Sequence, residues 1–233
     1  MTVNLTAKLF VPLQVLVVLA LPLLLLMSNL LWAVGEVRLY EYGFGKYRVS
    51  QVTEIEPLEL SKAAGGLVHY FNSPGEPIEV KVIRKGREFE LFNEREKIHL
   101  RDVKGLVQLG RRLRIGLLVY TLFFVGAARW WLRRDFRRTL AVAGLRGSWL
   151  TLALMLAFGL IALLGFEQIF LQFHLISFSN ELWLLDPARD YLIMMFPQGF
   201  FYEATLFIAL ATLVEAILLD GLCWAYLRVN PKG

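Results

Sequence analysis

The chain has 233 residues, of which 57% are hydrophobic and 19% charged, and its formal net charge at pH 7 is +5. The apolar residues occur in long blocks, which excludes an ordinary soluble fold and predicts an α-helical polytopic membrane protein with four transmembrane helices. The positive charge does not indicate nucleic-acid binding, because six arginines fall within residues 129–146, beside apolar segments and with Asp135 as the one acidic residue among them.

The first apolar block runs from about residue 9 to residue 34 and follows Lys8. A secretory signal peptide is the competing interpretation. The block is longer than a typical signal core and has no clear small-x-small cleavage site. We therefore predict a retained first transmembrane helix within residues 1–35.

Residues 36–112 change character and mix charges with short apolar patterns, which predicts a small α+β domain between the first two spans. Pro57 opens a stretch whose apolar residues recur on one helix face. Residues 72–75, Asn-Ser-Pro-Gly, end that stretch as a turn. Alternating apolar residues between 78 and 92, interrupted by a Lys-Gly pair, predict a β-hairpin.

A second helix is predicted to start after the hairpin. Asn93 followed three residues later by Glu96 is typical of an N-cap and its reciprocal partner, and the pattern continues to about Val107. The next apolar block predicts a second transmembrane helix over residues 113–132, which ends in two tryptophans suited to the membrane interface.

The rest of the chain predicts two more spans. The arginine-rich stretch forms a cytoplasmic basic loop at 133–148, followed by a third transmembrane helix at 149–172. An aromatic-rich loop with two prolines covers 173–200, and a fourth transmembrane helix covers 201–227. With the basic loop inside, both termini are cytoplasmic, and the α+β domain and the 173–200 loop share the extracytoplasmic face.

One charge cluster opposes this topology. Arg111, Arg112 and Arg114 flank the predicted outer end of the second span. They belong to a loop longer than about 60 residues, where positive charge has less influence on orientation. We therefore keep the topology set by the basic loop.

The three histidines are the first candidates for chemistry. His69 lies opposite the apolar face of its helix and is predicted to face water. His99 has Asp102 one helical turn later, and His174 stands where the third span leaves the membrane. A lone histidine is usually structural, but the topology brings His99 and His174 to one face of the membrane. This pairing favours catalysis or metal binding.

Two other kinds of site remain open alternatives. A metal site lacks a close-spaced ligand motif such as HExxH. Its ligand candidates are His99, His174, Asp102 and Asp186. A serine nucleophile at Ser177 or Ser179, near His174, lacks the GxSxG elbow.

Four acidic residues stand within or beside the last two apolar blocks, where charge is costly. Glu167 and Glu203 are close to the predicted outer ends and are candidates to border the histidine site, although interhelical hydrogen bonds or snorkelling carboxylates explain them equally well. Glu215 and Asp220 lie deeper and are predicted to be structural. Cys223, the one cysteine, excludes an intramolecular disulfide and is read as a small buried side chain.

Three segments carry a resemblance to a known family. They are YEYGFGKY after the first span, REKIHLRDVK, and FHLISFSNELWLLDPARDYLIMMFPQGFF. Together they resemble the bacterial lipoprotein intramolecular transacylase (Lit) family over nearly the whole chain. The second segment is similar to a histidine–methionine–x–aspartate–valine–lysine signature, with Leu100 in the methionine position.

The resemblance implies an acyltransferase. Its members move the sn-2 acyl chain of a diacylglyceryl-modified lipoprotein cysteine to that cysteine's own α-amino group, which leaves a lyso-lipoprotein. The family's essential histidines match His99 and His174. One histidine is expected to act as the base and the other as the oxyanion partner or the proton donor to the leaving oxygen, and Lys104 or Asn180 could also donate to the oxyanion. From its position one helical turn after His99, Asp102 is expected to hydrogen-bond that ring, and an ion pair with Lys104 or an arginine is the alternative.

The implied chemistry agrees with the composition of the chain. The nucleophile is the substrate's amine, and conversion of an ester to an amide is downhill, so no enzyme nucleophile, metal or cofactor is expected. The expected partners are diacylglyceryl-modified bacterial lipoproteins and membrane lipids, with no nucleic acid, at the bacterial cytoplasmic membrane. Two alternatives are kept: a non-enzymatic sensor or transporter subunit, and a histidine-metal lipid hydrolase.

Overall fold

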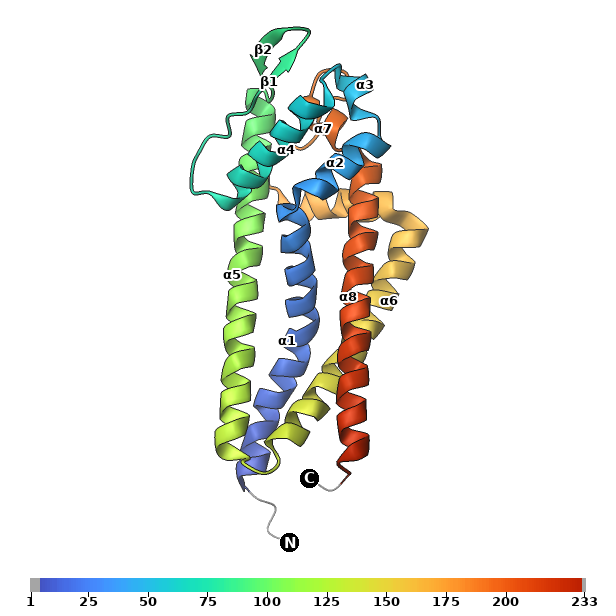
Figure 1. Cartoon of the computed structure of the whole chain (residues 1–233). Coiled ribbons are helices and arrows are strands. Elements are labelled where there is room, and N and C mark those ends of the chain that lie inside the picture. Colours follow the sequence, from blue (N-terminus) through green and yellow to red (C-terminus); the bar gives the residue numbers. More distant parts are fainter. Residues whose placement is uncertain (1–4, 232–233) are drawn as a thin grey trace. The chain divides into compact units, whose positions relative to one another are not determined.

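The computed structural model describes residues 5–231, and in that range four helices are long and apolar enough to cross a membrane (Figure 1). They are α1 (Leu5–Gly35), α5 (Glu94–Trp131), α6 (Phe136–Ser177) and α8 (Gln198–Val229). The prediction of a mostly helical chain with four candidate transmembrane helices is confirmed. The shorter elements are α2 (Val37–Lys46), α3 (Val49–Thr53), α4 (Pro57–Asn72), β1 (Lys81–Arg84), β2 (Arg87–Glu90) and α7 (Tyr191–Met195).

The chain divides into two compact units, each assembled from distant segments of the sequence. The first comprises the chain up to Leu30, Arg111–Leu163 and the chain from Phe207 on. The second comprises Leu31–Gly110 and Leu164–Leu206. The predicted domain at 36–112 is therefore not a unit by itself, because its residues up to Gly110 form one unit with Leu164–Leu206.

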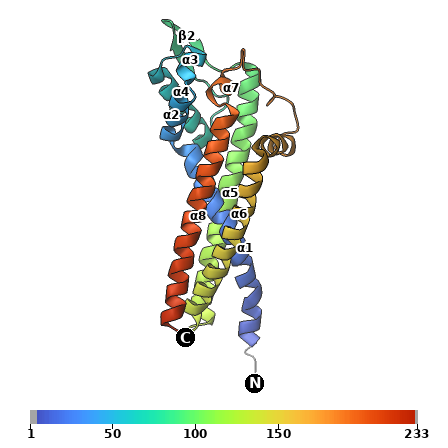
Figure 2. The same ribbon diagram turned by 90° about the vertical axis from the view of Figure 1, so that its right-hand side faces the viewer.

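Stretches of all four long helices lie side by side in the first unit (Figures 1 and 2). Phe10 and Phe124 pack with their ring centroids 5.2 Å apart. Gly147 allows a close approach, since a Cβ there would lie 2.6 Å from the Leu21 side chain. In lipid, helices have no hydrophobic driving force to associate. Small residues such as glycine therefore commonly stand where two membrane helices pack closely.

One group of polar residues in the spans of this unit forms hydrogen bonds between helices. The Asn29 amide donates to Glu215 at 2.8 Å and to Thr212 at 3.1 Å. This bond agrees with the structural role predicted for Glu215. Cys223 is half-buried and packs against Gly144, where a Cβ would lie 2.7 Å from its sulfur.

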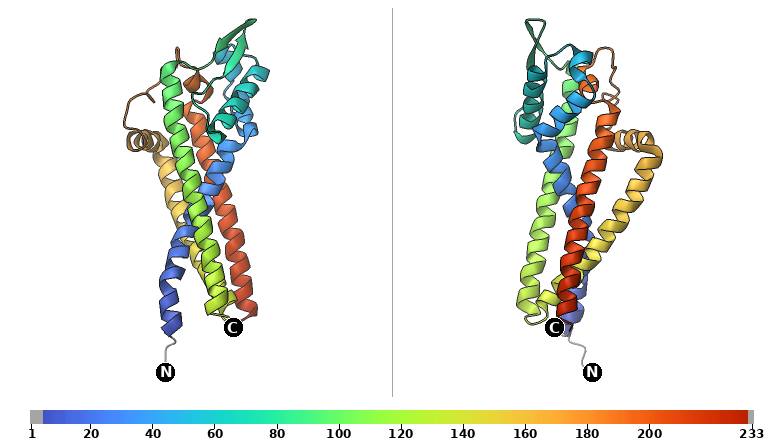
Figure 3. Two further views of the ribbon diagram at one scale, coloured as in Figure 1. Left: turned by 90° about the vertical axis from the view of Figure 1, so that its left-hand side faces the viewer. Right: turned by 45° about the vertical axis from the view of Figure 1, so that its right-hand side comes forward.

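The arginine-rich connection is shorter than predicted. Three segments lie at the same end of the first unit (Figure 3): the beginning of α1, the end of α8 and the turn at 132–135. Most of the predicted loop at 133–148 is helical instead, because α6 begins at Phe136. This stretch has no proline and is rich in Leu, Ala and Arg, which favour a helix.

The second unit has a hydrophobic core of its own, drawn from α2, α3, α4, the hairpin and α7. The predicted face of α4 is confirmed, since Leu60, Ala64 and Leu67 are at most 1% exposed. Met195 of α7 is completely buried in the same core. The segment after α6 is thus an integral part of this unit.

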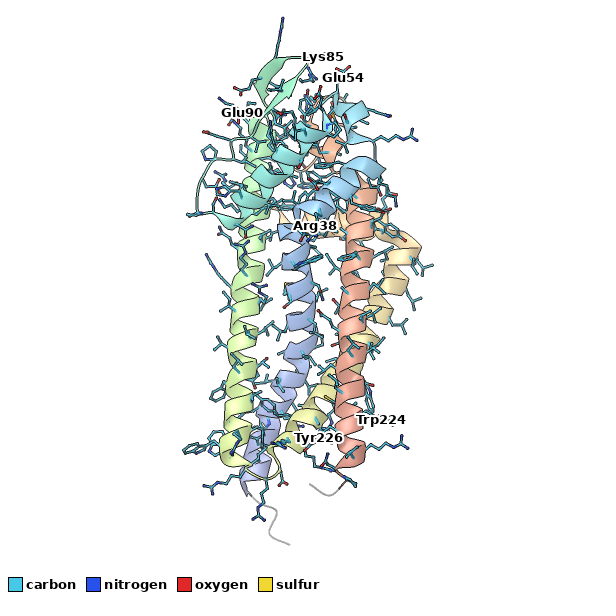
Figure 4. The ribbon with its side chains drawn as sticks, viewed as in Figure 1. Arg38, Glu54, Lys85, Glu90, Trp224 and Tyr226 are labelled. Carbon is cyan, nitrogen blue, oxygen red and sulfur yellow. The ribbon has the colours of Figure 1, made fainter. Side chains whose placement is uncertain are left out.

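The predicted hairpin is present, with shorter strands than the 78–92 pattern indicates. β1 and β2 pair antiparallel with Lys81 opposite Glu90. The two turn residues, Lys85 and Gly86, both have positive φ, at 52° and 76°, which suits the twist of a two-residue hairpin loop. Lys85 at the tip pairs with Glu54 at 2.7 Å (Figure 4).

The start of α5 follows the prediction, but its extent does not. The Asn93 backbone N–H donates to the Glu96 carboxylate at 2.8 Å, and the Glu96 N–H donates to the Asn93 side chain at 3.1 Å. The capping box is therefore confirmed. The predicted end near Val107 is wrong, because one unbroken helix continues to Trp131.

The third long helix also extends beyond its predicted limits. α6 runs to Ser177, with non-helical backbone angles at Gly165. His174 therefore lies in the last turn of a helix, not in the aromatic-rich loop that was predicted to begin at 173. That loop is itself interrupted by α7, and α8 begins at Gln198, before the predicted boundary at 201.

Candidate active site

His99 and His174, 75 positions apart in the sequence, come together in the second unit. Their ring centroids are 6.2 Å apart and the planes differ by 29°. His99 comes from the second turn of α5 and His174 from the last turn of α6, and they are 7% and 8% exposed. The predicted pairing of these two histidines is present in the structure.

Aromatic side chains surround the histidine pair. Phe178 contacts both rings, with centroids 5.0 Å from His99 and 5.6 Å from His174. Trp183 lies 4.9 Å from His174, and Phe170 lies 4.4 Å from it on the preceding turn. These rings keep water from the imidazoles, and electrostatic interactions are stronger in such surroundings.

One hydrogen bond orients the ring of His174. Its Nδ1 lies 2.7 Å from the carbonyl oxygen of Phe170. A carbonyl oxygen can accept but not donate, so Nδ1 carries a proton. The neutral ring then has its lone pair on Nε2, the arrangement that a general base needs.

His99 is held in its neutral form. Its Nδ1 is buried and has no hydrogen-bond partner among residues 5–231. Burial, and next the neighbouring His174, lower the pKa of His99 to about 4, while Asp102 acts in the opposite direction. The segment 94–112 is charged and precedes the apolar part of α5, so the ring lies outside the spanning segment.

The predicted bond between Asp102 and His99 is wrong, since Asp102 has another partner. The Asn180 amide donates to the Asp102 carboxylate at 2.9 Å. The same Asn180 accepts from the backbone of Leu182 at 3.0 Å. Asp102 therefore acts on His99 through its charge and connects α5 to the loop after α6.

Arg95 makes a second connection to that loop and was not singled out in the sequence. Its guanidinium donates to the carbonyl oxygens of Glu181 at 2.7 Å and Leu184 at 2.9 Å. Positions 95, 99 and 102 recur on one helix face. Arg95 and Asp102 thus fix, on either side of His99, the loop that carries Trp183.

A buried carboxylate network was also not foreseen from the sequence. Glu96 is fully buried and accepts from the backbone N–H of Leu192 at 2.7 Å as well as from Asn93. Asp190 is 1% exposed and accepts from the Asn93 amide at 2.9 Å. Burial raises the pKa of Glu96, and the charge of Asp190 adds to this. In the sequence, only the capping box pointed to a structural role for Glu96. It did not predict that Glu96 also contacts α7.

The Lys104 ammonium, a predicted candidate for the oxyanion donor, is occupied by contacts with the turn after α4. Its ammonium pairs with Glu76 at 3.1 Å, donates to the carbonyl oxygen of Gly75, and lies 4.0 Å from the centre of the Tyr70 ring. At 2% exposure the side chain is saturated by these contacts. It stabilises the turn after α4.

The two candidate carboxylates do not join the histidines in the structure. Glu203 forms an ion pair with Lys46 of α2. Glu167 is exposed on α6, two turns before His174. His69 is exposed, as predicted. Within the described residues no group of three or more His, Cys, Asp or Glu side chains is arranged to hold a metal ion.

Comparison with known proteins gives three findings. The family model of the lipoprotein intramolecular transacylase Lit matches residues 15–201. An uncharacterized protein of Aquifex aeolicus (strain VF5) is 30% identical over 127 residues, which is 54% of this chain and 54% of that relative. The in meso structure of the membrane integral lipoprotein intramolecular transacylase Lit from Bacillus cereus superposes with a TM-score of 0.81.

That structure is 21% identical to this chain, and the match covers 97% of this chain and 98% of the other. A variant of the Bacillus cereus protein in which one histidine is replaced by arginine matches with a TM-score of 0.75. The predicted fold class is therefore supported by a solved membrane protein as well as by the four apolar helices.

Proposed function

The chain belongs to the lipoprotein intramolecular transacylase (Lit) family, and from this premise we propose that it moves the sn-2 acyl chain of a diacylglyceryl-cysteine to the α-amino group of the same cysteine. The observation that carries the proposal is the pairing of His99 and His174, with ring centroids 6.2 Å apart, inside an aromatic enclosure. The product is an N-acyl, S-monoacylglyceryl lipoprotein. The reaction is an acyl transfer within one substrate molecule.

The bond changes balance without a cofactor. The amine nitrogen attacks the ester carbonyl carbon, and the bond from that carbon to the sn-2 glycerol oxygen breaks. The proton lost by the amine ends on that oxygen, which leaves as a hydroxyl. A free α-amino group has a pKa of about 7.7–8.0, so at neutral pH only modest help from a base is required.

The two histidines receive different roles. His174 serves as the base, because its Nδ1 is bound to the Phe170 carbonyl and its Nε2 lone pair is available. His99 has a pKa of about 4, which makes it a weak base and keeps it neutral at pH 7. A neutral imidazole donates a hydrogen bond to the developing oxyanion or to the leaving oxygen.

Positioning is expected to supply much of the catalysis. Direct attack closes a ring of roughly eight atoms through cysteine, sulfur and glycerol, and fixed geometry can contribute several kcal/mol to a reaction of this kind. The loop held by Arg95 and Asp102 places Trp183 and Phe178 against the histidines. These rings would hold the lipid head folded and exclude water, which would otherwise hydrolyse the ester.

The site is proposed to face the extracytoplasmic side. The support is the charge distribution, because the arginine-rich connection at 129–146 is typical of a cytoplasmic position. The residues around the histidines are assembled from segments 31–110 and 164–206, which the predicted topology puts on the opposite side. Mature lipoproteins present their lipid at that face.

Mass spectrometry of lipoprotein N-termini, with and without this protein, tests the proposal. A transacylase gives an N-acyl, lyso-glyceryl cysteine with an unchanged number of acyl chains. A lipid hydrolase removes one chain, and a sensor or transporter subunit changes nothing. Either of the last two results would contradict the proposed function.

Exhaustive chelation of the purified protein separates the organic mechanism from a metal site. Both histidine roles are proton or hydrogen-bond roles, so activity should persist after chelation. Loss of activity that zinc alone restores would instead favour the histidine-metal hydrolase.

A further inference from the structure

The two edges of the hairpin differ. Leu91 donates its backbone N–H to Val80 at 2.8 Å, so this pair is hydrogen-bonded. Since bonded and non-bonded pairs alternate, the N–H groups of Lys81 and Ile83 point away from β2, and those of Glu88 and Glu90 point away from β1. The β1 edge is covered, because Ile83 donates to the carboxylate of Glu59 at 2.9 Å.

The β2 edge is open and borders a groove. The groove has a volume of about 490 Å³ and is lined by residues 89–94, Glu96, Lys97, Arg189 and Tyr191. One wall is aromatic, since Phe89 and Tyr191 pack with ring centroids 5.4 Å apart and the Arg84 guanidinium lies over both rings. Glu90, at the foot of the hairpin, is labelled in Figure 4.

A second hollow adjoins the groove at Asn93 and Arg189. It has a volume of about 260 Å³, shares Asn93 and Arg189 with the first, and is also lined by Arg95 and Asp190. Arg95 is one helical turn before His99, which is about 6 Å along the helix axis. An extended chain covers that distance in about two residues.

We infer that this groove binds the polypeptide after the lipidated cysteine of a lipoprotein substrate, as an extended strand added to the open edge of β2. The inference rests on the proposed function, which puts the cysteine at the His99–His174 pair. The next two residues then pass Arg95 and Asn93, and later residues lie along Glu90 and Glu88.

The charges of the groove favour recognition through the backbone. Lys97 is paired with Glu90 at 3.3 Å and with Glu94 at 3.2 Å, and Arg189 contacts Asp190 at 3.6 Å. Lys97 and Arg189 are therefore neutralised by carboxylates beside them in the groove. The unpaired groups that remain at the edge are main-chain N–H and C=O, which bind a strand of any sequence. Such a site accepts lipoproteins that share a lipidated cysteine and differ in the residues after it.

The test uses synthetic diether lipopeptides, in which ether bonds replace the esters so that binding is measured without turnover. A lipopeptide with eight residues after the cysteine should bind the full-length protein more tightly than one with a single residue. In the long lipopeptide, a single N-methyl group is moved along the backbone from the third residue to the eighth. Binding should weaken by about 2- to 10-fold at alternate residues, because every second N–H faces β2.

Two proline variants provide a matched pair in the protein. Glu90→Pro removes an N–H at the open edge, whereas Lys81→Pro removes the N–H directly opposite, on the β1 edge. Glu90→Pro should abolish the advantage of the long lipopeptide, Lys81→Pro should retain it, and Glu90→Ala should retain it as well. If a proline variant fails to fold, the N-methyl series measured on the unchanged protein still tests the inference.

Equal affinity for long and short lipopeptides, or a loss that is uniform along the N-methyl series, would overturn the inference. Turnover of the matching diester lipopeptides is measured separately. Binding with a two-residue period but no acyl transfer would refute the proposed function and leave the groove in place. Acyl transfer that ignores peptide length, together with equal binding, would refute the groove alone.

Discussion

At the residue scale, the two histidines are distinguished by their surroundings. His174 donates from Nδ1 to a main-chain carbonyl of its own helix, and His99 has a buried Nδ1 without a partner in the described part of the chain. One hydrogen bond and one desolvated ring are the grounds on which we propose that His174 is the base and His99 the neutral donor. The sequence could pair these residues but could not assign the roles.

Both histidines should be essential. His99→Ala and His174→Ala should each nearly abolish lyso-lipoprotein formation, because loss of a base typically costs about 10²–10⁴ in rate and loss of an oxyanion donor about 10²–10³. His69→Ala, on the exposed face of α4, is the control and should have little effect. The measurement is the lyso-lipoprotein product at equal expression. Near-normal product from either of the first two variants would rule out the two-histidine mechanism.

The pH dependence of His99 follows from its lowered pKa. The ring should stay neutral down to about pH 4 in the folded protein, whereas in the unfolded chain it takes up a proton near pH 6.5. The stability that this ring contributes is therefore fully present above pH 6.5 and is lost as the pH falls toward 4. NMR of ¹⁵N-labelled histidine, assigned with His99→Gln, gives the titration midpoint. A midpoint at or above 6.5 would show that the ring is not desolvated.

Asp102 should act through the loop and through charge. Asp102→Ala removes the bond to Asn180 and should release the loop that carries Trp183, which lowers activity. Asp102→Asn keeps an acceptor for Asn180 and loses only the charge, so its activity should fall less and the His99 pKa should fall further. Product formation and the NMR titration together check this order. Equal activity in the alanine variant and the parent would show that the connection is dispensable.

At the element scale, the start of α8 packs closely on α2. Gly43 of α2 faces the ring of Phe200, and a Cβ at Gly199 would lie 2.6 Å from the Tyr47 hydroxyl. These residues belong to the YEYGFGKY and PQGFF motifs, which are far apart in the sequence. Both motifs therefore serve, in part, to join two helices of the unit that contains the histidines.

Gly43→Ala should destabilise this contact, because the added Cβ would overlap with the Phe200 ring. Overpacking of this kind typically costs about 1–3 kcal/mol. Gly45→Ala is the matched control on the same helix, since a Cβ there meets nothing within 4 Å, and alanine favours a helix over glycine. Thermal unfolding in detergent measures both. A Gly43→Ala protein as stable as Gly45→Ala would show that α2 and α8 are not packed in this way.

At the scale of the whole molecule, the positions of the arginines govern the expected orientation. A reporter fused near Ser73 should register as extracytoplasmic, and one fused near Arg138 as cytoplasmic, because the basic connection is retained inside. Alkaline phosphatase and green fluorescent protein fusions measure this. The reverse pattern would put His99 and His174 on the wrong side for mature lipoproteins and would contradict the proposed function.

The sequence by itself determined the elements that depend on local chemistry or on long apolar runs. The four long helices, the start of α4 at Pro57, the capping box of Asn93 and Glu96 and the Lys-Gly turn were all predictable, because each follows from residues close together in the chain. Motifs also singled out His99 and His174. The helix ends were less predictable, because nothing in the local sequence stops α5 at Val107 or delays α6 beyond Phe136.

Only the tertiary structure decided which side chains meet. Asp102 was expected to bind His99, one turn away, but Asn180 competes for the carboxylate from 78 positions away. Lys104 was a candidate oxyanion donor, but the turn at Gly75 and Glu76 occupies its ammonium. Arg95 and Glu96 bind backbone groups of the segment after α6, and the sequence did not predict these contacts. Contacts between distant segments depend on how the helices pack, and local periodicity contains no information about them.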